Sequence, residues 1–179
     1  MGECKDLADS IHCRPPQFHK HGVLLSRFDT ALVNDGTGEV TGAEGKSFVN
    51  AVVKHLVNPL AGYHICRVRV VFSLRTDALS ILFNPGVEVH KHLAYVQWYS
   101  PLINPDPNHQ LYKITPLKNH DGTNVCSIIP LANIRQSVHL FSIFGRFASQ
   151  EWTSANVLDS CKSFFVNSFT DRHLYRILY

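Results

Sequence analysis

The chain has 179 residues, of which 45% are apolar and only 17% charged, and its formal net charge is +3 with the histidines neutral. This is the composition of one globular domain that can bury a core without disulfide or metal staples, which excludes a disordered chain. The charge is also too small for a typical domain that coats nucleic acid. Because a usual domain is about 25% charged, we expect a partner, or the rest of a larger protein, to cover part of the surface.

The cysteines are odd in number and form no C-x-x-C pair; they are Cys4, Cys13, Cys66, Cys126 and Cys161. This pattern argues against a disulfide framework and against a cysteine-rich zinc site. Free thiols favour a reducing compartment, so we expect the cytosol or nucleus. No secretion-signal pattern opens the chain, and no apolar run approaches the roughly 20 residues that span a membrane. We therefore expect no membrane partner.

The N-terminal quarter of the chain predicts one irregular segment, one strand region and one loop. Residues 1–20 are polar and lack periodicity, so we expect a flexible lead-in to a single β-rich domain at 21–179. Residues 22–33 predict a strand, or two strands with a bend at Asp29. The glycine-rich residues 34–45 predict a loop or hairpin turn.

The next segments predict a short helix and a strand of clean alternation. Apolar spacing at 46–57 suits a helix, although its valines favour strand. In residues 63–74 the apolar side chains alternate with a second set that includes Arg67 and Arg69. We therefore expect these two arginines to face solvent or a partner, where they could contribute charge or bind phosphate.

The rest of the chain reads as short strands followed by a helix. A single turn is expected at 131–135, and a helix at 154–165 with a cap at Thr153 or Ser154. Short strands separated by turn signals indicate a mainly β fold, a distorted barrel or open sheet with a C-terminal α-helix. The remaining predicted strands are 78–83, 93–99, 109–114, 125–129 and 138–144.

The most informative stretch is the aromatic strand at 93–99 with the loop and short strand that follow it. Each large aromatic ring buries about 150–250 Å², so these rings form either core or the wall of a recognition site. By alternation Trp98 lies with Ala94 and Val96 and is expected in the core, whereas Tyr95 and Tyr99 are the expected exposed pair.

Catalytic and cofactor motifs are weak or missing in the sequence. The glycine-rich segment 35–45 matches neither the Walker pattern nor G-x-G-x-x-G, and no nucleophile or zinc-protease signature is present. Two H-x-H pairs, His19 with His21 and His90 with His92, could chelate a divalent ion if a third ligand joined them. We expect no enzymatic activity and no cofactor.

Several runs resemble the C-terminal region of fungal proteins associated with large DNA transposons of the Kyakuja-Dileera-Zisupton type. These runs are HLAYVQWYSPL, PDPNHQLYKI, SIIPLANIRQSVHLFSIFG and WTSANVLDSCKSFFVNSFTDRHLY, in that order, and the resemblance covers about residues 60–179. A more distant resemblance, over roughly 22–179, is to the bromo-adjacent homology (BAH) domain, a β-rich chromatin module. It rests on FDTALV, ICRVRVVF, AYVQWYSPL, HQLYKI, IIPLANIRQSVHL and CKSFFVNSFTDRHLY.

The BAH resemblance implies a nuclear domain that binds a protein or the nucleosome. Members of that family that recognise methyl-lysine bind it in a cage of aromatic side chains. The cage positions would fall here on His64, Trp98 and Ser100. Only Trp98 keeps the usual aromatic ring, so these residues argue against methyl-lysine recognition.

Taken together, these patterns predict a non-enzymatic interaction module of a transposon-related or chromatin-associated nuclear protein. The expected ligand-binding residues are His64, Trp98, Tyr99 and Tyr112, with Arg67 and Arg69 as nucleic-acid contacts. Two alternatives stay open: a sequence-independent DNA-binding domain, and a structural docking domain of a larger transposase-like polypeptide. The oligomeric state is not indicated by the sequence.

Overall fold

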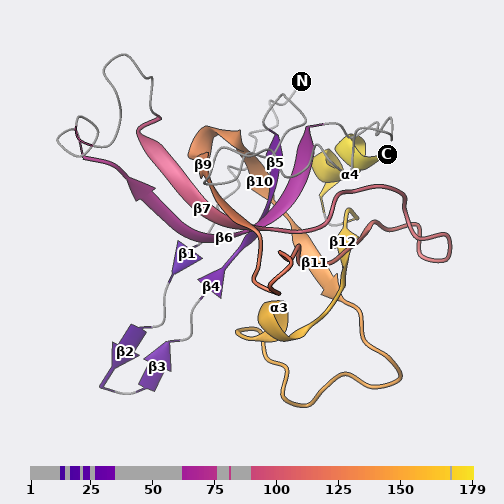
Figure 1. The fold of residues 1–179 in the computed structure, drawn as a ribbon. Helices are drawn as coiled ribbons and strands as arrows, with labels where there is room; N and C mark the ends of the chain where they lie inside the picture. The colour runs from indigo at the N-terminus through magenta and orange to yellow at the C-terminus, as the bar shows by residue number, and fades with distance from the viewer. Residues whose placement is uncertain are drawn as a thin grey trace, which may run out of the picture.

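A five-stranded antiparallel sheet forms the centre of the molecule (Figure 1). The computed structural model describes residues 13–14, 17–20, 22–24, 27–34, 62–75, 81, 90–169 and 171–179. The strand order in the sheet is β10-β5-β6-β7-β9. Its strands are β5 (Thr30–Asn34), β6 (Tyr63–Ser73), β7 (His92–Trp98), β9 (Cys126–Pro130) and β10 (Ile134–Ser137).

The two edges of this sheet are joined by a very short connection. β9 and β10 lie at opposite edges, yet only the 3-10 turn η1 (Leu131–Asn133) separates them in the chain. Because three residues cannot cross a flat five-stranded sheet, the sheet must curl so that its edges approach each other. The sheet stays open, since β9 and β10 do not pair.

The inner face of the curled sheet holds the first of two cores. Residues alternate along β7, so Ala94, Val96 and Trp98 point inward together, as the alternation predicted. They pack with Cys66 and Val68 from β6 and with apolar residues of β5 and β9. We call this group the inner core.

The second core lies between the outer face of the sheet and a smaller layer. That layer is a three-stranded antiparallel sheet of order β11-β12-β8, with the C-terminal helix beside it (Figure 1). Leu32 and Tyr99 from the large sheet pack there with Phe164 and Leu174, and we call this group the outer core. The elements of the layer are β8 (Lys113–Ile114), β11 (His139–Ser142), β12 (Phe164–Asn167) and α4 (Arg172–Leu178).

Four short strands precede β5 and form two pairs. β2 and β3 make a hairpin that projects from the body of the molecule, and β1 pairs with β4 (Figure 1). Their bounds are β1 (Cys13–Arg14), β2 (Gln17–His19), β3 (Gly22–Leu24) and β4 (Arg27–Phe28). The expected bend at Asp29 is confirmed, because β4 ends at Phe28 and β5 begins at Thr30. Parts of the segment expected as an irregular lead-in are therefore in strands.

The predicted fold class is confirmed: the protein is mainly β, with open antiparallel sheets and a short C-terminal helix. Strands stand where alternation placed β6, β7 and β9, and η1 stands where a single turn was expected. The glycine-rich loop from residue 35, the helix at 46–57 and the strand at 78–83 lie outside the described residues, apart from Ile81, whose backbone is helical.

The helix predicted at 154–165 is wrong in extent. Only α3 (Val157–Ser160) is helical there, and Cys161 ends it with extended backbone at φ −80° and ψ 136°. Phe164 and Phe165 belong to β12, which pairs with β11 and β8. The run of aromatic and β-branched residues gains more from this pairing than from another helical turn, so tertiary context overrides the apolar helix-like spacing.

Candidate functional site

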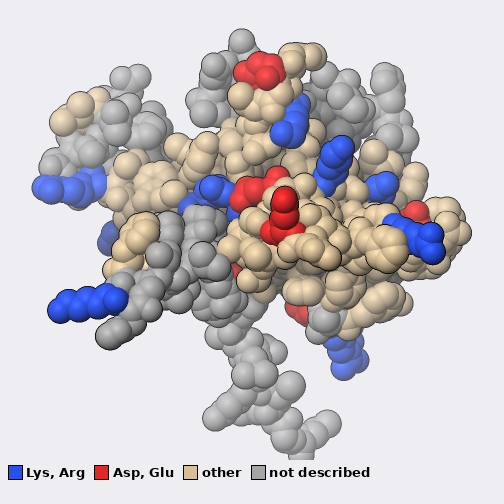
Figure 2. Space-filling view, turned by 90° about the horizontal axis from the view of Figure 1, so that it is seen from below, with Lys and Arg blue, Asp and Glu red and all other residues tan. Residues whose placement is uncertain are grey.

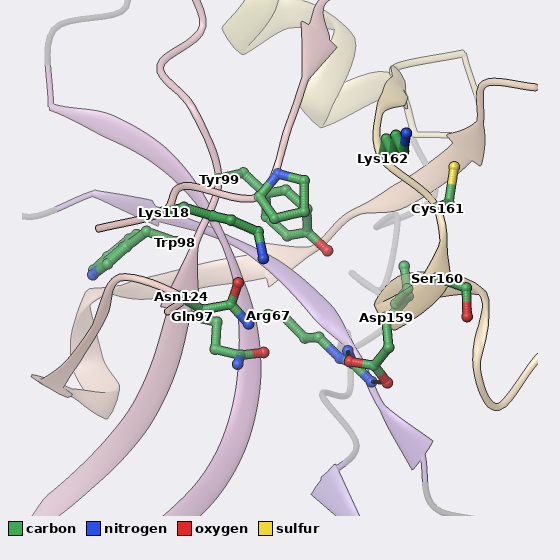
Figure 3. A pocket seen from close by; sticks show the side chains of 12 residues that line it. Arg67, Gln97, Trp98, Tyr99, Lys118, Asn124, Asp159, Ser160, Cys161 and Lys162 are labelled. Atoms are coloured by element: carbon green, nitrogen blue, oxygen red, sulfur yellow. Dashed lines mark hydrogen bonds and ion pairs between the residues drawn. The ribbon is translucent and has the colours of Figure 1, made fainter. Parts of the chain in front are cut away.

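A cavity of about 400 Å³ opens where the end of β7, the segment 116–124 and α3 meet (Figure 3). β7 contributes Gln97 and Trp98, and Tyr99 follows directly after it. The chain then returns through residues 116–118, where Leu117 donates to the Trp98 carbonyl at 2.9 Å and accepts from Val125 at 2.9 Å. These backbone bonds bring Lys118 and Asn124, which form a β-bridge, to one wall of the cavity.

The floor of the cavity is a buried arginine held by one carboxylate. Arg67 donates from Nη1 to Oδ1 of Asp159 at 2.5 Å and from Nη2 to Oδ2 at 3.2 Å. Nη1 of Arg69 also lies 3.6 Å from the same Oδ1. The Arg67 side chain is only 5% exposed. The bidentate ion pair with Asp159 compensates for the hydration that the buried guanidinium loses.

Arg67 was expected to face solvent or a partner, and the first of these is wrong, because its side chain is buried. Alternation correctly places it on the outer face of the sheet, where it pairs across β6 and β7 with Gln97. That part of the outer face is covered by the α3 segment, which supplies Asp159 as the compensating charge. Arg69 occupies a β-bulge between Val68 and Val70 and keeps more exposure than Arg67.

The Tyr99 phenol points into the cavity although the residue as a whole is buried. Figure 3 shows its hydroxyl directed toward the space bounded by Lys118 and Asp159. Burial, partly offset by the charge of Arg67, raises the pKa of Tyr99 above its ordinary value. The phenol is thus neutral at pH 7 and can donate a hydrogen bond, and among the described residues no acceptor is bonded to it.

The expected exposure of Tyr99 is wrong, with a clear cause. Tyr99 lies on the outer face of the large sheet, as its parity requires, but the smaller sheet covers that end of the face. Its ring packs edge-on against Phe164 of β12, with centroids 5.9 Å apart, and the residue is 6% exposed. Tyr95, farther from the smaller sheet, is 40% exposed, as the alternation predicted.

The lining of the cavity is rich in hydrogen-bond donors and in positive charge. Lys118 and Lys162 stand on opposite walls, and the side-chain amides of Gln97 and Asn124 point toward the same space as Lys118 (Figure 3). Lysine and arginine can only donate, and Asp159 is already engaged by arginine. Two lysines therefore stand beside an arginine–carboxylate pair whose charges offset each other, an arrangement suited to an anionic group such as a carboxylate or phosphate.

The predicted site residues are only partly brought together. Arg67, Trp98 and Tyr99 line the cavity. His64 does not, but its ring meets Trp98 edge to face with centroids 6.0 Å apart. Tyr112 lies elsewhere, in the outer core, where its hydroxyl donates to the Leu178 carbonyl at 3.2 Å.

The positions expected for a methyl-lysine cage do not assemble into one. Trp98 is 3% exposed, and its Nε1 donates to the Ser127 hydroxyl at 2.6 Å, so the indole belongs to the inner core. The Ser100 hydroxyl instead accepts from the Thr115 amide at 3.1 Å. Nearby Lys118 would also repel a methylated ammonium group, which needs open aromatic faces.

An exposed apolar row borders the cavity on the same face of the sheet. Val70, Tyr95 and Ile128 pair directly across β6, β7 and β9, and they are 48%, 40% and 48% exposed. The neighbouring row toward the cavity contains Arg67 and Gln97. A contiguous exposed apolar patch beside a polar pocket is typical of a protein-interaction surface.

Charged side chains do not gather into one basic field on the face that carries α3. Figure 2 shows this face from below, with acidic and basic side chains interspersed over the residues that the structure describes. Within the same residues no three His, Cys, Asp or Glu side chains converge as a metal site, and no helix is long and apolar enough to cross a membrane. Cys66, Cys126 and Cys161 are free thiols.

No family profile, curated protein or solved structure matches the chain. The transposon-associated and BAH-like resemblances therefore stay predictions.

Most residues that line the cavity were not predicted from the sequence. Lys118, Asn124, Asp159 and Lys162 carried no motif, because Arg67 and Asp159 are 92 residues apart and meet only through the fold. No local signal marked the ion pair, because Arg67 alternates with apolar residues as a solvent-facing side chain would.

Proposed function

We propose that the protein is a non-enzymatic interaction module that binds a partner protein through this cavity, capturing an anionic side chain on the partner. The observation that carries the proposal is the donor-rich lining, in which Tyr99 and Lys118 face one space above the paired Arg67. A carboxylate or phosphate entering there would accept from several donors at once. Charge-assisted hydrogen bonds of this kind are about twice as strong as neutral ones.

The apolar row of Val70, Tyr95 and Ile128 supports a protein partner over duplex DNA. Duplex DNA presents phosphates, which favour a broad basic surface, whereas protein interfaces combine an apolar centre with a few polar anchors. The row and the cavity are adjacent on one face, so a single partner can cover both. A chromatin-associated, nuclear setting, with the nucleosome as partner, rests on the BAH resemblance alone.

The test compares reconstituted nucleosomes with the same DNA free of histones in gel-shift assays across a salt series. We expect a preference for nucleosomes that survives moderate salt, because the cavity binds protein rather than DNA phosphates. Lys118→Gln should weaken nucleosome binding about tenfold, the loss of one charged anchor of about 1.4 kcal/mol. Lys113→Gln, which removes an equally exposed lysine from β8 outside the cavity, should leave binding unchanged.

Two results would overturn the proposal. Equal binding to nucleosomes and free DNA that collapses as salt rises would mean plain electrostatic DNA binding. Nucleosome binding that Lys118→Gln and Lys113→Gln reduce equally would mean that the cavity is not the contact.

A further inference from the structure

Three exposed aromatic rings lie in and beside the C-terminal helix, away from the cavity: Tyr175 is within α4, Phe169 precedes it and Tyr179 follows it. The rings of Phe169 and Tyr175 lie 6.3 Å apart with planes inclined by 31°, and those of Tyr175 and Tyr179 stack at 5.0 Å and 25°. These residues are 66%, 46% and 50% exposed. Single exposed apolar side chains are ordinary, but three neighbouring rings make a continuous surface that water solvates poorly. We call them the aromatic ladder.

The helix carries basic side chains directly beside the ladder. Leu174 and Leu178 turn into the outer core and Ile177 packs partly against it, whereas Arg172, Tyr175 and Arg176 are exposed. Arg172 precedes Tyr175 by three residues and Arg176 precedes Tyr179 by three, so each exposed arginine neighbours a ring on the helix surface. Asp171 is the acidic group at the start of the helix, and its Oδ1 accepts from the Leu174 amide at 3.3 Å. Two guanidinium groups thus border the ladder against one carboxylate that the helix itself engages.

The ladder is held in place by contacts with the body of the protein. The Tyr179 hydroxyl donates to the Gln110 carbonyl, and the Tyr179 ring lies 5.8 Å from the buried ring of Tyr112. Tyr112 in turn donates from its hydroxyl to the Leu178 carbonyl at 3.2 Å. Because the Tyr179 ring is fixed before any partner arrives, little rotamer freedom is lost there when a flat group stacks on it.

We propose that the aromatic ladder around α4 is a binding surface for single-stranded DNA, with bases stacking on the exposed rings and Arg172 and Arg176 contacting phosphates. Surfaces that bind single strands without sequence preference combine these two elements, stacked aromatic rings and a basic track. In duplex DNA the bases already stack on one another, so their faces are not available to stack on these rings.

The choice of DNA rests on the hydroxyl groups. A protein tells RNA from DNA by contacting the 2′-hydroxyl. The Tyr179 hydroxyl, which belongs to the ladder, already donates to the Gln110 carbonyl, so it is not free to donate to a 2′-hydroxyl. An RNA strand is therefore expected to bind no tighter than DNA. The inference is independent of the cavity and of its proposed partner.

The test is fluorescence anisotropy of the whole chain with a labelled oligo-dT of about 20 nucleotides, longer than one stacking platform requires. Tyr175→Leu keeps an apolar side chain but removes the central ring, and we expect at least about fivefold weaker binding. The matched control is Phe147→Leu, which removes a ring that is 80% exposed and also adjoins an arginine, Arg146, but lies outside the ladder. It should leave the affinity unchanged.

A second variant tests the phosphate contacts and does not touch the packing of the rings. Arg172→Gln with Arg176→Gln should reduce the slope of log K against log salt by about 1.4, the value for two phosphate contacts on a single strand. No binding of the unaltered chain to oligo-dT would overturn the proposal. So would equal binding of a duplex of the same length, tighter binding of oligo-U, or equal losses in Tyr175→Leu and Phe147→Leu.

Discussion

Breaking the Arg67–Asp159 pair should destabilise the protein more than any surface charge change would. Asp159→Asn removes the negative charge and one of two acceptors, and leaves Arg67 buried with its charge uncompensated. Removing one partner of a fully buried pair costs about 3–5 kcal/mol, and exposed pairs are worth about 1 kcal/mol or less. Here the Arg67 side chain is 5% exposed and that of Asp159 55%. We therefore expect a loss of about 2 kcal/mol in the free energy of unfolding.

Urea unfolding followed by tryptophan fluorescence measures this loss, and thermal unfolding should show a Tm lower by about 4–8 °C for a domain of this size. Glu151→Gln serves as the control, because it removes an exposed acid away from the pair. Replacing both partners, by Arg67→Met with Asp159→Leu, should recover much of the lost stability, since the buried Arg67 charge is then absent. A loss below about 0.5 kcal/mol for Asp159→Asn, the size of a surface effect, would refute the account of the cavity floor.

Three further changes test the cores and the titration of the cavity. Ser127→Ala leaves the buried Trp98 indole N–H without its acceptor and should cost about 1–3 kcal/mol, measured by urea unfolding. Phe164→Ala opens a cavity in the outer core and should cost about 3–5 kcal/mol, whereas Phe147→Ala, at an exposed ring, should stay within about 0.5 kcal/mol. Because burial raises the pKa of Tyr99, its contribution to stability is full below about pH 10 and is lost as the pH rises further. Ultraviolet titration should show a late phenol step that Tyr99→Phe removes; titration of all phenols in one step near pH 10 would contradict this.

Alternation was enough to predict most of the strands and one of the two core faces. In β7 it separated inward Trp98 from outward Tyr95, and both burial states agree with the structure. It was misleading at Arg67 and Tyr99, which lie on the predicted face but beneath other elements. A strand pattern determines which side of a sheet a residue occupies, but what covers that side depends on contacts between distant segments.

The candidate site could not be predicted for the same reason. Lys118 reaches the cavity because a β-bridge with Asn124 turns the chain back, and Asp159 reaches it because α3 ends after a single turn. The sequence predicted a longer helix there, at 154–165. The helix ends early because Phe164 and Phe165 pair with β11 and β8. Helix propensity, which depends on local sequence, does not include this competing strand pairing.

The bond between the start of β5 and the chain just before β11 has a consequence for how the protein is made. Thr30 donates from its hydroxyl to the Val138 carbonyl, 108 residues later, and the Val138 amide donates back to Thr30 at 2.8 Å. During synthesis β5 therefore emerges long before β10, its neighbour in the sheet, has been translated. Until then its outer edge is open to pairing with other chains, so folding should be slow and prone to association, and a truncation before residue 134 should leave that edge permanently open.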